Sequence, residues 1–325
     1  MDTLIFYFII FAYLLLCELV YFRIARHYNI GDNVTHRSSH EGYQLTGGGI
    51  IFIISAIIFW IWYSIWQQAP PIPHFSTMMK IALGLAILSF IDDIKELSPI
   101  IRLICHVIAI AVTFYYIFEH GYIDIYILVL IGGVGLINAY NFMDGINGIT
   151  AGYSIITLCT LLYCYIVTPG IPIEFILSLL IATVIFTFFN FRKNAVCFSG
   201  DVGAIVMGFF ILFLTVELIL LRNDATPIVF LIVYGIDSVY TIFQRLFMGE
   251  NIFLPHRHHL YQVFANQWAI PHYKVSLGYC TTQLVINVLY FFIPEDYKWT
   301  YVIIIVILLS IIYFVAKRSP LSRSN

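Results

Sequence analysis

Residues 203–221 read GAIVMGFFILFLTVELILL, a run in which Glu217 is the only charged side chain. An apolar run of about 20 residues is long enough to cross the roughly 30 Å hydrocarbon core of a bilayer as one helix. Asp201 stands between two glycines just before this run, at the place where such a helix leaves the membrane. The stretch therefore predicts a membrane helix with a chemically active group at its end.

The rest of the chain repeats this apolar character. Hydrophobic residues make up 61% of it and charged residues 10%, whereas soluble domains carry about 25% charged residues. Eleven spans are expected, at residues 3–22, 49–66, 77–91, 100–118, 122–138, 148–167, 173–190, 203–221, 226–244, 276–293 and 299–316. Ten spans are the alternative, because the third is short and the ninth contains Asp237. We predict an all-α polytopic membrane protein of one domain, residues 1–325, with a small cytosolic loop at about 248–275.

The polar residues form five clusters, each of which follows an odd-numbered span. The clusters are residues 37–49, Asp92 with Asp93, and residues 138–147, 198–203 and 256–259. Each crossing of the bilayer reverses the direction of the chain, so loops after odd-numbered spans emerge on the same face. We therefore expect the five clusters to form one composite site at one membrane surface.

The distribution of lysine and arginine predicts the orientation of this surface, because cytoplasmic loops are enriched in these residues. The odd-numbered loops and the C-terminal tail hold Arg23, Arg26, Arg37, Lys95, Arg102, Arg192, Lys193, Arg245, Arg257, Lys274, Lys317, Arg318 and Arg323. The even-numbered loops hold only Arg222 and Lys298, with Lys80 near the start of the third span. We predict a periplasmic N-terminus, a cytoplasmic C-terminus and a site on the cytoplasmic face.

Asp92 and Asp93 end the third span. Adjacent carboxylates repel each other unless a positive group lies near them, and a hard divalent cation such as Mg²⁺ is the usual one. We interpret Asp201 as the carboxylate that completes a metal site with this pair. The alternatives are an acidic helix end in contact with water and, for Asp201, a simple helix N-cap.

Residues 138–148 read NAYNFMDGING and are the most specific of these clusters. A spacing of three residues places Asn138, Asn141 and Asp144 on one helical face. Glycine allows backbone amides to approach a phosphate or a base closely. A solvated turn also favours Asn, Asp and Gly, but it does not require this spacing.

His256, His258 and His259 surround Arg257 in the last cluster. These side chains are suited to hold phosphate oxygens through N–H donors. Zn²⁺ is the alternative, but it normally requires further Cys, His or carboxylate ligands at wider spacing. The phosphate interpretation is favoured, because no neighbouring segment offers such a set.

The first loop holds Arg37, Ser38, Ser39 and His40, followed by the glycine triplet 47–49. A glycine triplet that enters a helix can bring its N–H groups to an anion. Together with the other clusters, this loop resembles the polyprenyl-phosphate N-acetylhexosamine-1-phosphate transferase family. That family is glycosyltransferase family 4-like and includes phospho-N-acetylmuramoyl-pentapeptide transferase. The resemblance runs from Asp32 to Gln262, with the clusters in the same order.

The resemblance implies Mg²⁺-dependent transfer of a sugar 1-phosphate from a UDP-sugar to undecaprenyl phosphate, with release of UMP; Mn²⁺ is the alternative cation. It implies that Asp92, Asp93 and Asp201 are catalytic or metal-binding carboxylates and that Asn141 lies beside the diphosphate. The predicted site comprises catalytic Asp92, Asp93 and Asp144, metal ligands Asp201, Asn141 and Asp93, and substrate-binding Asn138, Asn147, Gly148, Arg37, His40, His256, Arg257, His258 and His259. The resemblance also implies that the protein lies in the bacterial inner membrane and that it can form a homodimer. No basic block stands apart from the loops, and no nucleic-acid partner is expected.

Two positions depart from the family pattern. Family members often have a proline between the first-loop histidine and the glycines, where this chain has residues 41–46 without one. Asn147 stands where the family has the second aspartate of a D-G-x-D-G motif. In relatives that aspartate contacts the uracil. An asparagine can still accept from the uracil N–H and donate to a carbonyl.

The residues 260–262 that follow the histidines favour the branch of the family that uses simple UDP-N-acetylhexosamines. That branch initiates surface polysaccharide or O-antigen synthesis with an N-acetylhexosamine or a 6-deoxy relative. The alternative branch uses UDP-N-acetylmuramoyl-pentapeptide for cell-wall synthesis. A second alternative is a membrane carrier with intramembrane carboxylates, but carriers place such charges near the midplane. A third alternative, a non-catalytic paralogue, is disfavoured because Asp92, Asp93 and Asp201 are all present.

Overall fold

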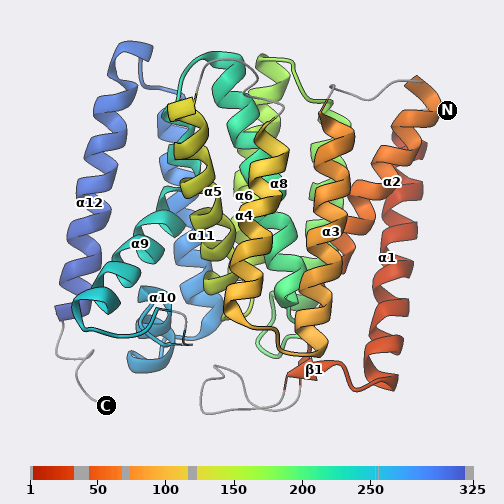
Figure 1. Ribbon diagram of the computed structural model, residues 1–325, viewed down its shortest axis with the longest axis horizontal. Coiled ribbons are helices and arrows are strands. Elements are labelled where there is room, and N and C mark those ends of the chain that lie inside the picture. The colour runs from red at the N-terminus through yellow and green to blue at the C-terminus, as the bar shows by residue number, and fades with distance from the viewer. Residues whose placement is uncertain are drawn as a thin grey trace.

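The computed structural model describes residues 3–32, 44–67, 74–115, 123–252, 254 and 256–318. The described chain is a bundle of long helices that run side by side, with α1 and α12 at opposite edges (Figure 1). A short antiparallel ribbon, β1 (Gly31–Asp32) with β2 (Gln44–Leu45), lies at one end of the bundle. The predicted all-helical, multi-pass membrane architecture is confirmed. Arg37 and His40 lie outside the described residues.

The helices follow the predicted spans one for one. They are α1 (Thr3–His27), α2 (Ile50–Gln67), α3 (Phe75–Ile94), α4 (Pro99–Tyr115), α5 (Ile123–Met143), α6 (Ile149–Val167), α7 (Ile173–Asn190), α8 (Gly200–Arg222), η1 (Thr226–Leu231) continued by α9 (Ile232–Phe247), α11 (His272–Tyr290) and α12 (Lys298–Arg318). Short segments α10 (Leu260–Gln262), η2 (Val263–Gln267) and η3 (Glu295–Tyr297) complete the described part.

Eight of the described helical segments are long and apolar enough to cross a membrane, namely α1, α3, α5, α6, α7, α8, η1 with α9, and η3 with α12. The helices α2 and α4 are apolar but shorter. α11 is long enough but more polar than the others, because its buried face carries Ser276, Gln283 and Asn287.

α8 forms the centre of the bundle. All its residues from Val202 to Leu218 are buried, and it packs mainly against α3 and α5. A helix that is apolar on all sides is stable only where other apolar surfaces surround it, which explains the uninterrupted apolar run of its sequence. α1 and α12 instead expose large apolar side chains such as Phe8 and Leu308, as expected for helices in contact with lipid.

The N-terminal ends of α2 and α8 touch backbone to backbone. A Cβ atom added to Gly49 would lie 2.2 Å from the Cα of Gly203, so no larger residue fits there. The N–H groups of Gly48 and Gly49 donate to the carbonyls of Phe198 and Ser199, each at 2.9 Å. The expectation that the glycine triplet turns its N–H groups to an anion is therefore wrong for these two residues, because both N–H groups join the two helix ends.

The ninth span is broken inside the bundle, between η1 and α9. Gln283 of α11 bridges the break: its Oε1 accepts the Val233 N–H at 3.1 Å and its Nε2 donates to the Val229 carbonyl at 3.0 Å. Backbone groups that a break frees inside a membrane need such partners. The break therefore requires the buried glutamine that makes α11 polar.

The polar clusters of the described residues meet at one end of the bundle, as the parity of the spans predicts. The C-terminal ends of α3 and α5, the N-terminal ends of α4 and α8 and the segment after α9 all contribute to one cavity there. The periplasmic N-terminus and cytoplasmic C-terminus stay predictions.

Candidate active site

A cavity of about 460 Å³ lies where these helix ends meet. Its polar lining consists of Ser89, Asp92, Arg102, His106, Asn138, Asn141, Asp201, Arg245, His256, His259 and Gln262. Its apolar lining includes Leu88, Leu103, Val134, Ile205 and Ile242. The cavity thus places acidic, basic and hydrocarbon surfaces side by side.

Asp92 and Asp201 come from different helices and share one arginine. Nη1 of Arg102 lies 2.9 Å from Oδ2 of Asp92 and 3.2 Å from Oδ2 of Asp201. The other oxygen of Asp92 accepts the N–H of Leu97 at 2.6 Å, which fixes the turn between α3 and α4. The predicted convergence of Asp92 and Asp201 is therefore present, with a guanidinium between the two carboxylates.

Asp93 points away from this pair and holds the start of α8. Its Oδ1 accepts the N–H of Asp201 at 2.8 Å, and its Oδ2 accepts the N–H of Val202 at 3.1 Å. A carboxylate at a helix N-terminus satisfies free N–H groups and complements the helix dipole. Asp93 does not line the cavity in the described residues, so its contact with the site passes through the backbone of Asp201.

Asp144 lies behind the cavity as well. Its Oδ2 accepts a hydrogen bond from the hydroxyl of Ser199, the N-cap residue of α8. Burial raises the pKa of Asp144 above its usual value, while hydrogen bonds from Ser199 and Thr150 lower it in part. The structure therefore brings Asp144 to the same helix end as Asp93.

The asparagines of residues 138–148 divide between the cavity and its surroundings. Asn138 and Asn141 line the cavity. Asn147 is 5% exposed, and its Nδ2 donates to the carbonyls of Arg192 at 2.9 Å and Lys193 at 3.1 Å. Its Oδ1 is buried and has no hydrogen-bond partner among the described residues. Asn147 thus ties its loop to the one before α8.

Gly148 takes part in the same connection between loops. It has φ +84, in the left-handed region that favours glycine. Its N–H donates to Oδ1 of Asn190 at 2.8 Å, and the Asn190 amide donates to the Cys197 carbonyl at 2.9 Å. Gly148 therefore shapes the chain behind the cavity.

A buried aspartate orients one histidine of the last cluster. Oδ1 of Asp237 lies 3.3 Å from Nδ1 of His259 and accepts the Leu260 N–H at 2.8 Å. Oδ2 of Asp237 accepts the hydroxyl of Tyr279 at 2.7 Å. His259 is 1% exposed, lines the cavity, and has no partner for its Nε2 in the described residues. A ring held through one nitrogen in this way keeps a defined orientation.

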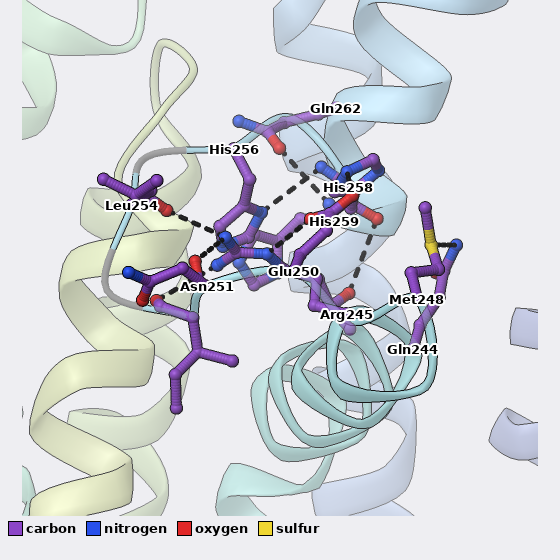
Figure 2. A network of polar contacts seen from close by, with 12 residues as sticks. Gln244, Arg245, Met248, Glu250, Asn251, Leu254, His256, His258, His259 and Gln262 are labelled. Atoms are coloured by element: carbon purple, nitrogen blue, oxygen red, sulfur yellow. Dashed lines mark hydrogen bonds and ion pairs between the residues drawn. The ribbon is translucent and has the colours of Figure 1, made fainter.

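Arg245 holds the segment that carries the histidines (Figure 2). Its guanidinium donates to Oε2 of Glu250 at 3.0 Å and to the carbonyls of Asn251 at 2.5 Å, Ile252 at 3.1 Å and Leu254 at 3.0 Å. Glu250 also lies 3.1 Å from Nε2 of His258. One buried side chain therefore holds residues 250–252 and Leu254 beside the cavity.

The remaining members of the cluster differ in position. His256 lines the cavity, and burial together with nearby cationic groups lowers its pKa to about 3, so its ring is neutral at pH 7. Arg257 and His258 are half-buried and do not line the cavity in the described residues. Lys317, near the end of α12, donates to the backbone carbonyl of His258 and to Oε1 of Gln244 at 3.1 Å. The last helix thus reaches the histidine segment.

The carboxylates suit a divalent cation that is shared with a substrate. In the described residues, no three or more His, Cys, Asp and Glu side chains form a complete metal cage. Mg²⁺ usually binds through one or two carboxylates together with water and substrate phosphates. The guanidinium nitrogen between Asp92 and Asp201 demonstrates that a positive group fits there. These two side chains are therefore the candidates to hold such a cation.

Sequence reasoning missed three cavity residues or their supports. Arg102 was interpreted only as a topology signal, although it follows Asp92 by ten residues at the start of the next span. His106, one helical turn further on, shares its face. Asp237 was noted as an intramembrane carboxylate but not paired with His259. The available signal was an ionisable residue inside an apolar helix. Placing such a residue in a membrane costs free energy, so its presence indicates a functional role.

The fold and the cavity together define a multi-pass membrane protein with a polar site at one end of its helix bundle. Residues 75–219 match the model of the family described as glycosyl transferase family 4. This segment contains Asp92, Arg102, Asn141 and Asp201, so the resemblance inferred from the motifs is confirmed over this part of the chain.

Individual relatives cover more of the chain. The phospho-N-acetylmuramoyl-pentapeptide-transferase of Lactobacillus gasseri is 27% identical over 76% of this chain and 84% of its own length. The enzyme of the same name from Limosilactobacillus reuteri is 27% identical over 69% of this chain and 77% of its own length. The probable undecaprenyl-phosphate N-acetylglucosaminyl 1-phosphate transferase of Bacillus subtilis is 26% identical, over 74% and 70%.

Proposed function

We propose that the protein transfers a sugar 1-phosphate from a UDP-sugar to undecaprenyl phosphate and releases UMP. The observation that carries this proposal is the cavity itself, where Asp92, Asp201 and Arg102 face an apolar wall. The reaction joins a membrane-bound phosphate to a water-soluble diphosphate, and it needs a site of this mixed character at a membrane surface. The names of the relatives support the same reaction class.

In this reaction an oxygen of the lipid phosphate attacks the β-phosphorus of the UDP-sugar. The bond from this phosphorus to the bridging oxygen breaks, and UMP leaves with the electron pair. A bound Mg²⁺, or Mn²⁺ in its place, supplies charge neutralisation of the diphosphate and polarisation of the β-phosphorus. Asp201 and Asp92 would hold this cation, with Asn141 beside the diphosphate.

The chain contributes mainly orientation and electrostatics. Asp92 orients the attacking phosphate, which is already largely ionised at pH 7 and needs no strong base. His256 and His259 offer ring nitrogens to the donor phosphates, and Asp237 fixes the His259 ring for this purpose. Asp93 and Asp144 act by holding the start of α8, so that Asp201 keeps its position. A two-step route through an aspartyl-phosphate is the alternative, and the stereochemistry of the product at phosphorus separates the two.

For the donor we propose a simple UDP-N-acetylhexosamine or a 6-deoxy relative, on the basis of residues 256–262. This assignment places the protein at the start of surface polysaccharide or O-antigen synthesis, on the cytoplasmic face of a bacterial inner membrane. UDP-N-acetylmuramoyl-pentapeptide is the second candidate, because the relatives from Lactobacillus gasseri and Limosilactobacillus reuteri carry that activity in their names. A panel of both donors with the purified protein distinguishes the two.

The proposed reaction is tested by UMP release from purified protein with undecaprenyl phosphate, Mg²⁺ and the donor panel. We expect metal-dependent release with one donor class and about a thousandfold lower turnover in Asp201→Asn, because the substitution removes several kcal/mol of charge stabilisation. His27→Gln, on the exposed end of α1, is the matched control and keeps full turnover. No UMP from any donor would reopen the carrier alternative.

A further inference from the structure

α4 presents two basic side chains to the cavity that the proposed donor and metal contacts do not use. Arg102 and His106 are four residues apart and therefore lie on the same face of this helix. Both line the cavity. The Arg102 side chain is 32% exposed, whereas His106 is 3% exposed. The helix thus carries a basic strip from the polar end of the bundle inward.

His106 is buried with unsatisfied hydrogen-bonding capacity. Its Nδ1 has no hydrogen-bond partner in the described residues. The Asn138 side chain lies close to the ring, and the Asn138 amide donates to the Val134 carbonyl at 2.7 Å. A buried polar atom without a partner costs free energy, and a ring oriented by a second side chain is typical of a binding residue. His106 is therefore a buried, oriented ring that has hydrogen-bonding capacity left for a ligand.

Arg102 also has donors to spare. A guanidinium offers five N–H donors, yet both hydrogen bonds of this side chain within the described residues come from Nη1. When Asp92 and Asp201 hold a divalent cation, they no longer need this guanidinium as their counterion. Arg102 can then turn its remaining N–H groups to an anion without leaving the cavity.

The surroundings of the strip indicate which anion it takes. α4 starts at Pro99, at the polar end, and each helical turn advances by about 5.4 Å, so His106 lies about one turn deeper than Arg102. At this depth the cavity wall is apolar and includes Leu88, Leu103, Val134 and Ile205. The histidine segment after α9 covers the other side, which we assign to the water-soluble donor. A phosphate on a hydrocarbon chain matches the α4 side.

We infer that Arg102 and His106 bind the phosphate monoester of the lipid acceptor, with Asn138 as the positioning residue of His106. The identity of the ligand rests on the proposed function, while the binding site rests on the geometry of α4. The two side chains place the phosphate beside Asp92 and leave its chain along the apolar wall. They contribute to acceptor binding and not to recognition of the nucleotide.

The inference is tested by binding measurements without donor and without turnover. Purified protein in detergent is titrated with a short-chain prenyl phosphate, the corresponding prenyl alcohol, inorganic phosphate and UDP. We expect Arg102→Ala and His106→Ala each to weaken prenyl phosphate binding by about tenfold or more, because each removes hydrogen bonds to a charged group. Prenyl alcohol and UDP are expected to bind these variants as they bind the wild type.

Matched variants control for folding and for charge. His106→Gln keeps an N–H donor and a partner for Asn138, so it is expected to retain more affinity than His106→Ala. Arg26→Ala and His27→Ala remove the same residue types from the exposed end of α1 and are expected to leave all affinities unchanged. If His106→Ala does not fold, the His106→Gln and Arg102→Lys variants decide the question.

Three outcomes would overturn the inference. They are unchanged prenyl phosphate affinity in the Arg102 and His106 variants, a loss of UDP affinity instead, and inorganic phosphate that binds the wild type as tightly as prenyl phosphate does. A protein that binds prenyl phosphate through these residues but releases no UMP would refute the proposed reaction alone. An active enzyme with unaffected variants would refute the acceptor site alone.

Discussion

Asp92 and Asp93 are neighbours in the chain but belong to two different regions of the molecule. Asp92 faces the cavity and shares Arg102 with Asp201, whereas Asp93 holds two backbone N–H groups of α8. We call the first region the cavity layer: Asp92, Arg102, His106, Asn138, Asn141, Asp201, Arg245, His256 and His259. We call the second the supporting layer: Asp93, Asp144, Asn147, Asn190 and Asp237.

The motif of residues 138–148 divides between these layers in the same way. Asn138 and Asn141 reach the cavity, but Asp144 and Asn147 of the same motif bind other loops. Successive residues of a helix point about 100° apart, and here Asp92 faces the cavity while Asp93 binds the backbone of α8. One motif can therefore combine reacting groups with the side chains that hold them, and substitutions distinguish the two.

The largest expected difference between the layers is that between Asp92→Asn and Asp93→Asn. Asp92→Asn is expected to lower kcat by about a thousandfold, because it removes charge from the proposed metal site. Asp93→Asn is expected to lower the thermal stability more, because an amide supplies one good acceptor where the carboxylate supplied two. Steady-state UMP release and thermal unfolding of both proteins check this contrast. Equal loss of kcat with unchanged stability in both would abolish the distinction between layers.

Arg245 belongs to the cavity layer by position and to the supporting layer by its contacts. Arg245→Ala is expected to lower the free energy of unfolding by about 3 kcal/mol, because three backbone carbonyls and Glu250 lose their partner. Arg245→Lys keeps the charge but not the planar fork, so an intermediate loss is expected. Arg23→Ala on the exposed side of α1 is the control without effect. Unchanged stability in Arg245→Ala, measured by denaturant unfolding, contradicts a supporting role.

Asn147→Asp tests the supporting layer at a position where the family has an aspartate. The Asn147 amide donates to two backbone carbonyls. A buried carboxylate at this position would place its oxygens against these carbonyl oxygens, and all of them are acceptors. We expect a loss of about 2 kcal/mol in stability, measured against Asn194→Asp in the exposed part of the neighbouring loop. A stable variant with a lower KM for the UDP-sugar would instead indicate that residue 147 contacts the uracil, as the family resemblance implies.

The expected effect that is smallest at neutral pH concerns protonation of the cavity layer. The pKa of His256 is lowered to about 3, compared with about 6.5 in an unfolded chain. As the pH falls below 6.5, His256 therefore becomes protonated in the unfolded state but stays neutral in the folded state, and the free energy of unfolding decreases. His256→Gln is expected to make the unfolding temperature less dependent on pH between 6.5 and 4, whereas His27→Gln is not. Identical pH slopes in wild type and His256→Gln would remove this contribution.

The sequence predicted the fold well because apolar runs of this length have few alternatives in a membrane. Parity then predicted that Asp92, Asn141, Asp201 and His256 converge, which they do. The rotation of each helix about its own axis was not predictable, because lipid-facing and buried residues are both apolar here. For this reason the sequence predicts a catalytic role for both Asp92 and Asp93.

Contacts between distant segments were also beyond the sequence. The pairing of Asp237 with His259 and the hydrogen bonds from Arg245 to residues 250–252 and Leu254 depend on where α9 tilts after its break from η1. Gly48 and Gly49 donate to α8 because their loop packs against it, which no local pattern specifies. Arg102 was hidden by the general excess of positive charge in odd-numbered loops.

Lys317 has a practical consequence for work with this protein. It sits one residue before the end of α12 and donates to the carbonyl of His258, so the final turn of α12 anchors a segment of the site. A fusion partner or purification tag joined directly after that turn, or a truncation upstream of it, is expected to disturb substrate handling without touching any cavity residue. Expression designs that keep α12 intact and separate the tag with a flexible spacer avoid this defect.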